Sequence, residues 1–332
     1  MGVIVFLLIS SFSVAGFNCN CEKSLSKKQN DNSDISYSLG LLDDETFDDP
    51  FLKNPINISG TPPEEWDWRD VNDKNYMTDV RDQGDCGSCY VYGVTGVMEA
   101  MYNIQKNNPN LDIDLSEQFV VSCSMKPPYT NNGCCGGYKS VTLSFLKDKG
   151  APSEECFPYQ EVDANGRDYD DCPHGSPSHD PVSCDMACEN WEDEAIKIKE
   201  YTSLYSRDSI KNAISKYGPV VASLSVYMDF YFYNYGIYRH KFGNYVGLHM
   251  VSIVGYDDSS EYWICRNSWG KSWGEDGYFR IAYGECAIDS PGGVICIESL
   301  SIENLRPRVI FNRYIENFPI LQVLFNKILL IN

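Results

Sequence analysis

The hydrophobic pattern of the chain changes near Ala195. Before this point, apolar side chains recur at helical spacing from Tyr90 to Lys106, which predicts a helix with one buried face. Leu115-Ser116-Glu117-Gln118 begins a second helical piece. After Ala195 the apolar runs are short and bounded by Gly, Asp and Ser, as strands are; they are Val220–Val226, Met250–Val254, Glu261–Arg266 and Gly277–Ile281. This pattern predicts an α+β protein with an antiparallel, barrel-like second half.

The N-terminal segment has the pattern of a secretory signal peptide over residues 1–15, because the apolar run Val3–Val14 ends in small residues suited to cleavage. The run is shorter than the ~20 residues that a membrane-spanning helix needs. Residues 16–61 are polar and acidic with little periodicity, so we expect a short propeptide, although a disordered linker would have the same pattern. Asn57-Ile58-Ser59 is a glycosylation sequon.

At the other end, residues 301–332 form a C-terminal extension of unknown role. Phe318–Ile331 is mostly apolar but too short to span a bilayer. It could pack on the domain, form a small helix, or bind a membrane or a partner, and the sequence does not separate these.

The composition limits the compartment and the partners. A chain of 332 residues, 43% hydrophobic and 22% charged, can form one large domain or two packed halves. The net charge of −20 argues against nucleic acid or an anionic membrane surface as a partner. With 14 cysteines, the chain has more than a typical cytosolic protein, which indicates disulfides and the secretory pathway.

Candidate chemistry begins at Cys86-Gly87-Ser88-Cys89, directly before the first predicted helix. A helix N-terminus favours a thiolate, so Cys89 is a candidate nucleophile. A Cys-x-x-Cys pair is also typical of a redox dithiol or of half a zinc site. The redox interpretation lacks a preceding strand, and the zinc interpretation lacks a well-spaced second ligand pair. The catalytic interpretation needs a histidine and an orienting polar group downstream.

His249 is the candidate base among four histidines, since it begins the apolar run that follows it. A lone histidine at a strand start is as often structural. One strand later comes Asn267, and adjacent antiparallel strands can place its carboxamide beside the imidazole. The carboxamide oxygen would then fix the tautomer and leave the other ring nitrogen facing the thiol.

Four segments in this order resemble the papain family of cysteine proteases. They are the opening Asp67-Trp68-Arg69, Cys86-Gly87-Ser88-Cys89-Tyr90, the loop Gly133-Cys134-Cys135-Gly136-Gly137, and Asn267-Ser268-Trp269-Gly270. The resemblance implies a two-lobed fold over residues 62–300. A mainly helical left lobe (about 75–193) and an antiparallel β-barrel-like right lobe (about 194–300) would enclose the active site in the cleft between them.

The resemblance also assigns roles. Gln83 and the Cys89 backbone N–H would stabilise an oxyanion, and Trp269 would shield the Asn267–His249 bond. For substrate binding it implies Gly136, Gly137, Leu248, Trp273 on the leaving-group side, and Pro291 at the floor of the P2 pocket. Because no acid stands at residue 291, we expect an apolar P2 preference.

The family further implies three disulfides: Cys86 with Cys134, Cys123 with Cys172, and Cys156 with Cys184 or Cys188. Connectivity cannot be settled from sequence alone.

The expected activity is hydrolysis of peptide bonds through a thiolate–imidazolium pair and a thioester, without a cofactor or metal, by a monomeric endopeptidase. Polypeptides would be the substrates and protein inhibitors further partners, in a lysosome or vacuole or outside the cell. Two alternatives remain: a carboxydipeptidase similar to cathepsin B that uses His174 and His179, and a catalytically silent binding scaffold.

Overall fold

The computed structural model describes residues 37–44, 58, 60–111, 113–160 and 182–302. The predicted signal peptide, Asn57, Cys172, His174, His179 and nearly all of the C-terminal extension lie outside these ranges, so those predictions stay untested. Within the described ranges, no helix is long and apolar enough to cross a membrane.

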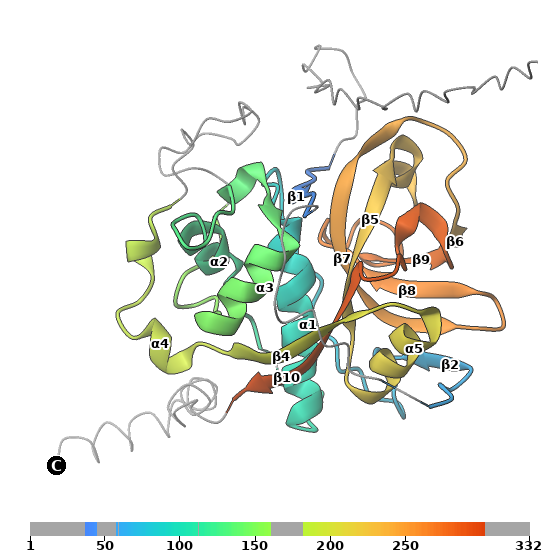
Figure 1. The fold of residues 1–332 in the computed structure, drawn as a ribbon, viewed down its shortest axis with the longest axis horizontal. Helices are drawn as coiled ribbons and strands as arrows, with labels where there is room; N and C mark the ends of the chain where they lie inside the picture. Colours follow the sequence, from blue (N-terminus) through green and yellow to red (C-terminus); the bar gives the residue numbers. More distant parts are fainter. Residues whose placement is uncertain (1–36, 45–57, 59, 112, 161–181, 303–332) are drawn as a thin grey trace, which may run out of the picture. The chain divides into compact units, whose positions relative to one another are not determined.

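The helices are concentrated in the first half of the described chain (Figure 1). The longest is α1 (Cys89–Gln105), whose side chains are buried on nearly every face. It is followed by α2 (Glu117–Cys123), where the Ser116 hydroxyl caps the first turn by accepting from the Phe119 N–H. Next come α3 (Lys139–Asp148) and the single turn α4 (Trp191–Glu194). Short 3₁₀ turns lie at η2 (Gly133–Cys135) and η4 (Cys184–Met186). The predicted helix from Tyr90 and its position behind Cys89 are confirmed.

The second half forms one sheet with the strand order β4-β10-β5-β7-β8-β9-β6. Its strands are β4 (Lys197–Leu204), β5 (Val220–Tyr227), β6 (Ile237–Tyr238), β7 (Tyr245–Asp257), β8 (Tyr262–Arg266), β9 (Tyr278–Ala282) and β10 (Val294–Ser301). All four predicted strand runs are confirmed. Neighbours are antiparallel except β6 and β9, which run parallel. Helix α5 (Arg207–Lys216), the turns η5 (Met228–Phe232) and η6 (Glu285–Ala287), and β2 (Glu65–Asp67) complete this part.

Two separate hydrophobic cores account for the two lobes. One core gathers α1, α2 and α3 around residues such as Val94, Met98 and Phe145. The other fills the space enclosed by the sheet and α5, with Phe230, Trp263 and Phe279 among its largest members. Because α1 also packs on β7, the N-terminus of α1 and the middle of β7 lie at the junction of the lobes. Cys89 and His249 occupy these two places.

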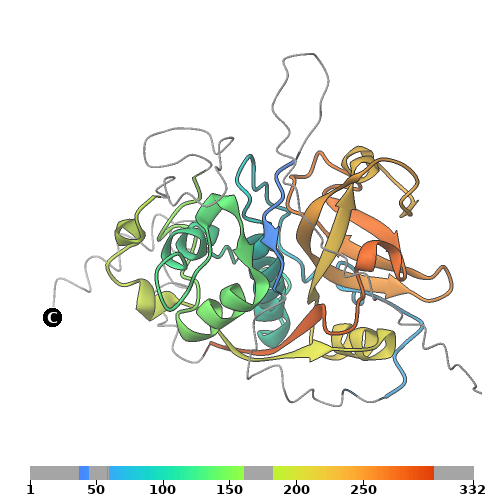
Figure 2. The same ribbon diagram turned by 45° about the horizontal axis from the view of Figure 1, so that its top comes forward.

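A short strand from the predicted propeptide lies at the same junction. This strand, β1 (Leu41–Leu42), pairs in parallel with β3 (Gly137–Tyr138) and antiparallel with β7 at Leu248. Figure 2 shows β1 in blue between the green helical lobe and the orange sheet. The strand therefore connects the two lobes across their junction.

Candidate active site

Cys89 is the first residue of α1, and its side chain is completely buried. The turn before it is held by the Ser88 hydroxyl, which lies 2.7 Å from the Tyr159 hydroxyl. Tyr159 in turn donates to the Gln83 carbonyl at 2.9 Å. These bonds fix the loop that presents the thiol at the helix N-terminus, where the helix dipole favours a thiolate.

His249 is oriented by Asn267 as the sequence predicts. Its Nε2 lies 2.7 Å from the carboxamide oxygen Oδ1, which can only accept, so Nε2 carries the hydrogen and Nδ1 is left as the acceptor. The same oxygen accepts from the Ser268 backbone N–H at 2.8 Å, which fixes the carboxamide itself. Nδ1 has no hydrogen-bond partner among the described residues. The Trp269 ring lies 4.7 Å from the imidazole and shields it from water.

The thiol and the imidazole belong to one site, because the backbone of Met250, the residue after His249, hydrogen-bonds to Cys89. Their surroundings hold both groups neutral. Burial raises the pKa of the Cys89 thiol to about 11, although backbone bonds from Met250 and Gly40 oppose the rise. Burial also lowers the pKa of His249 to about 4, with the Asn267 bond opposing. The expected thiolate–imidazolium pair is therefore disfavoured while the site is covered.

Gln83 is a buried donor held in one orientation. Its Oε1 accepts from the Ser268 hydroxyl at 2.6 Å, so the amide nitrogen Nε2 must point the other way. Nε2 donates to the Cys86 carbonyl at 2.8 Å and to the Ser38 carbonyl at 3.1 Å. The Ser38 carbonyl oxygen belongs to residues 37–44, which come from a distant part of the chain. The Nε2 hydrogen that meets this oxygen is therefore suited to bind a substrate oxyanion at the same place.

The glycine-rich loop lies against the nucleophile loop. A disulfide joins Cys86 to Cys134, and Gly87 N–H donates to the Cys134 carbonyl at 2.9 Å. Below Gly137 lies the ring of Tyr90, and a Cβ added at Gly137 would come within 2.5 Å of it. Gly137 N–H donates to the Gly40 carbonyl at 2.8 Å. The loop thus binds an extended backbone by main-chain hydrogen bonds, as expected for this glycine-rich sequence.

Residues 37–44 occupy the site along its length. Tyr37 stacks on Trp269 at 4.6 Å, and the Gly40 N–H lies 3.3 Å from the Cys89 sulfur. Leu41 pairs with both Gly137 and Leu248. At the far end the Asp44 carboxylate accepts from the Ser140 N–H at 3.0 Å and from the Ser140 hydroxyl at 2.8 Å.

One predicted substrate-binding residue is placed differently from the expectation. Pro291 is exposed and does not line the hollow of about 210 Å³ beside β1; Ala287, Ser290 and Gly293 of the same segment do so, opposite Leu224 and Leu248. The chain turns sharply at Cys286, which has a positive φ, so a fixed count along the sequence misplaces the floor. Trp273 is buried beside Trp269, and its indole N–H donates to the Tyr231 carbonyl, while its expected place on the leaving-group side stays a prediction.

The disulfides correct one predicted pairing. Cys86–Cys134 is confirmed, and Cys156 pairs with Cys188, one of the two expected partners. Cys123 pairs with Cys184, so the prediction of Cys123 with Cys172 was wrong. Cys184 and Cys188 therefore both bond to cysteines of the helical lobe. A long loop separates these partners along the sequence, so the sequence does not indicate that they lie close together.

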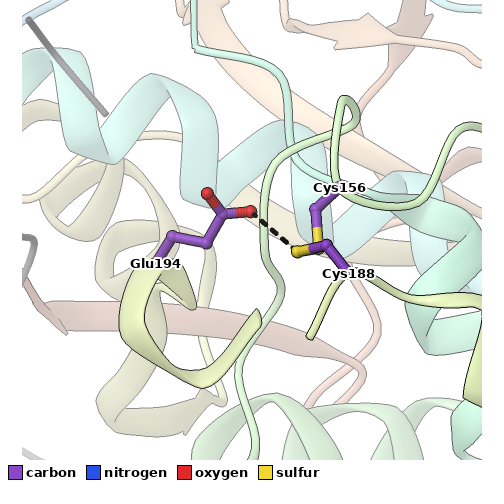
Figure 3. Close-up of side chains that lie close together, drawn as sticks. All are labelled: Cys156, Cys188 and Glu194. Atoms are coloured by element: carbon purple, nitrogen blue, oxygen red, sulfur yellow. Dashed lines mark hydrogen bonds between the residues drawn. A yellow bond between two sulfur atoms is a disulfide. The ribbon is translucent and has the colours of Figure 1, made fainter. Parts of the chain in front are cut away.

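Cys156, Cys188 and Glu194 have ligand atoms close enough together to hold a metal ion (Figure 3). However, the two sulfurs are bonded to each other, and the nearby carboxylate of Glu194 accepts from the Ser153 hydroxyl at 2.9 Å. A disulfide sulfur is not a thiolate ligand. This group is therefore a structural link between loops.

Ser268 and Tyr159 are positioning residues that the sequence analysis did not identify. Ser268 lies inside the motif that was recognised for Asn267, and Tyr159 lies three residues after Cys156. Ser268 bonds to Gln83 from a distance of 185 residues along the chain. Its only signal in the sequence is its place directly after Asn267.

Comparisons with known proteins agree with this geometry. A family model described as papain family cysteine protease matches residues 62–293. The chain is 32% identical over 271 residues to a cathepsin L-like proteinase of Fasciola hepatica, covering 75% of this chain and 74% of that protein. It is 35% identical over 237 residues to cathepsin B-like CP1 of Giardia intestinalis, covering 68% and 71%.

Solved structures of two proenzymes share the fold. Digestive procathepsin L 3 of Tenebrio molitor larval midgut matches with a TM-score of 0.58 at 30% identity, covering 74% of this chain and 73% of that one. ProCathepsin B S9 from Trypanosoma congolense matches with a TM-score of 0.61 at 22% identity, covering 80% and 85%, which shows the fold alone.

Proposed function

Because this chain belongs to the papain family of cysteine proteases, we propose that it is an endopeptidase made as a zymogen, with Cys89 as nucleophile and His249 as its acid and base. The observation that carries the proposal is the pair of oriented groups at one buried thiol. Asn267 fixes the free nitrogen of His249, and Ser268 fixes the donor of Gln83.

The proposed reaction is acyl transfer. With the cleft open to substrate, the proton of Cys89 passes to His249 Nδ1, and the thiolate attacks the scissile carbonyl carbon. Gln83 and the Cys89 backbone N–H stabilise the oxyanion, each worth on the order of 3–4 kcal/mol in such sites. His249 gives its proton to the leaving amine, a thioester remains, and a water activated by His249 hydrolyses it.

Residues 37–44 act as the inhibitory part of a propeptide in this proposal. In the proposed direction of binding, the acyl part of a substrate pairs with Gly137, and the leaving part lies toward Trp269. Residues 37–44 run the opposite way, since Tyr37 contacts Trp269 and Leu41 pairs with Gly137. An N–H of Gly40, and not a carbonyl carbon, faces the sulfur. The segment therefore fills the cleft without being a substrate.

The endopeptidase mode is supported by the length of chain that the cleft holds. Residues 37–44 extend on both sides of Cys89, from Trp269 to Ser140, so a substrate could continue in both directions. The carboxydipeptidase alternative depends on His174 and His179, which lie outside the described residues. Cleavage of a peptide blocked at both ends would favour the endopeptidase, and a requirement for a free C-terminal carboxylate would favour the alternative.

An apolar P2 preference is part of the proposal, with a different basis from Pro291. Leu224, Leu248 and Ala287 supply apolar surface to the hollow beside Leu41. A preference for Arg over Leu at P2 would contradict it. For the cellular setting we propose the secretory pathway and then a lysosome, a vacuole or the exterior, with the enzyme as a monomer open to protein inhibitors.

The test is mass analysis of the products from a long defined peptide at acid pH under reducing conditions. We expect the activated enzyme to cleave internal bonds one residue after an apolar residue, which then occupies P2, and we expect no cleavage by Cys89→Ala. A silent scaffold would give no products, and its thiol would react with iodoacetamide at pH 5 no faster than free cysteine does.

A further inference from the structure

Lys139 is a half-buried cation in the wall of the hollow that residues 41–44 cover. It begins α3, directly after the Gly137–Tyr138 strand that pairs with β1. Its amine donates to the Gly293 carbonyl at 2.9 Å, so the side chain spans the hollow from one lobe to the other. Among the described residues that line the hollow, Lys139 is the only one with a positive charge.

The covering segment places carboxylates at this cation. Asp43 and Asp44 are the only acids among the described lining residues, and both interact electrostatically with Lys139. Burial lowers the pKa of the Lys139 amine, and the two carboxylates oppose that lowering. Asp44 also takes two hydrogen bonds from Ser140 at the start of α3. The protein thus already binds acidic side chains here.

Removal of residues 37–44 takes both carboxylates away and leaves the cation. The ammonium group then faces the emptied hollow beside Leu248 and Ala287, with the Gly293 carbonyl as its hydrogen-bond acceptor. An incoming carboxylate that again excludes water from the hollow would replace the opposite charges that Asp43 and Asp44 supplied.

The register identifies which substrate residue would supply it. Gly40 lies over the Cys89 sulfur, and Leu41, one residue further, pairs with Gly137 and Leu248 beside the hollow. In a substrate bound the opposite way, the residue over the sulfur is P1 and the one that pairs with Gly137 is P2. The P2 side chain therefore faces the hollow that contains Lys139.

We propose that Lys139 makes the P2 pocket a carboxylate-binding pocket in the mature enzyme, so that it cleaves substrates with glutamate at P2 as well as substrates with leucine at P2. This inference rests on the proposed peptidase function and adds a substrate class to it. The methylene groups of glutamate would lie against Leu248 and Ala287, and its carboxylate would meet the amine. Glutamine, of the same shape but uncharged, is the matched comparison.

The experiment compares kcat/KM for four fluorogenic peptides that differ only at P2, which is Leu, Glu, Gln or Arg. The enzyme is the full chain after activation at acid pH, assayed near pH 6. We expect Glu to exceed Gln about tenfold, since a half-buried ion pair is worth more than an exposed one. Arg should be cleaved more slowly than Gln.

Three variants assign this ratio to Lys139, each normalised to its own rate on the Leu peptide. Lys139→Gln should bring the Glu:Gln ratio to about 1, Lys139→Arg should keep it, and Lys139→Glu should reverse the order of Glu and Arg. Lys199→Gln, an exposed lysine on β4, is the control and should match the wild type. A ratio near 1 in the wild type, or a high ratio that survives Lys139→Gln, overturns the proposal.

A second measurement needs no enzyme variant. A peptide of residues 37–44 should inhibit the mature enzyme, and replacing Asp43 and Asp44 by Asn should weaken inhibition about tenfold. Equal inhibition by the two peptides overturns the carboxylate site. If no peptide with Leu at P2 is cleaved, the proposed function itself fails; if Leu is cleaved while Glu and Gln are equal, only this inference fails.

Discussion

At the residue scale, each chemical group of the site is held by a neighbour that takes no part in bond making. Asn267 Oδ1 accepts from both His249 and the Ser268 backbone, so the carboxamide cannot turn without losing two bonds. The Ser268 hydroxyl does the same for Gln83. Adjacent residues of one motif therefore orient both the proposed base and the proposed oxyanion donor.

Ser268→Ala should lower kcat about tenfold with little change in KM, because Gln83 then loses the bond that aims its Nε2. The loss should be smaller than for Gln83→Ala, where removal of an oxyanion donor costs on the order of a hundredfold or more. Steady-state kinetics of the activated enzyme measures both, with Ser259→Ala in an exposed turn as the control. The double variant should be no slower than Gln83→Ala alone; independent, multiplying losses would exclude a role through Gln83.

At the element scale, a two-residue strand lies across the junction that contains the site. β1 pairs with β3 on one lobe and with β7 on the other, and the Leu41 side chain is buried there. Gly40 enables this close approach, since a Cβ there would come within 1.7 Å of the Gly87 carbonyl oxygen. Backbone oxygens of a disulfide-linked loop cannot move aside easily, so only glycine fits.

Gly40→Val in the full chain should displace β1 and expose the thiol. We expect iodoacetamide to label Cys89 at least tenfold faster than in the unchanged zymogen at pH 7, where a thiol with a pKa of about 11 is thiolate in roughly one molecule in 10⁴. Ser38→Ala is the matched control, because the bond from this residue uses its backbone carbonyl. Equal labelling of the glycine and valine forms would show that the segment does not restrict the thiol.

The Cys156–Cys188 link provides a test at the same scale. Chelators should leave the activity and the melting temperature unchanged, because the sulfurs near Glu194 are bonded to each other. Replacing both cysteines by serine should lower the free energy of unfolding by about 2–4 kcal/mol, as expected for a closed loop of this length. Denaturant unfolding of the two forms measures the difference, and a loss of stability on metal removal would reverse the assignment.

At the scale of the whole molecule, the segment that covers the junction of the lobes links the protonation of His249 to the opening of the site. The covered site holds His249 with a pKa of about 4, below its ordinary value of 6.5. The covered form therefore binds fewer protons than an open, hydrated form between these values. By linkage, lowering the pH from 6.5 toward 4 favours the open form, and raising it favours the covered form.

The covering segment should thus loosen in acid through His249. The measurement is the hydrogen-exchange protection factor of residues 37–44, corrected for intrinsic exchange rates. As the pH is lowered from 6.5 to 4, this factor should fall by at most about tenfold for each pH unit. Cys89→Ala is used as background to prevent self-cleavage. Adding His249→Asn should flatten the dependence, and an equally steep profile in that variant would assign the effect to other groups.

Local features of the chain were sufficient to predict part of its elements and to name candidate catalytic residues, whereas helices α3 and α5 and strands β4 and β10 were not predicted. The helix behind Cys89 and the four strand runs follow from periodicity and from the Gly, Asp and Ser residues that bound them. Cys89, His249 and Asn267 were named as candidates from short motifs, and the role expected of Gln83 came from the resemblance to the papain family. These are signals that lie within a few residues of one another, so they survive without knowledge of the fold. The same applies to Cys86 and Cys134, each inside a recognised motif.

Contacts between distant segments were decided only by the tertiary structure. Folding brought Ser268 to Gln83, Cys184 to Cys123, and Ala287 and Ser290 to the hollow where a fixed count had placed Pro291. It also placed Gly40 over the sulfur and Lys139 across from Gly293. The physical reason is that loop paths and the packing of two lobes set these distances, and neither has a period or a motif along the chain.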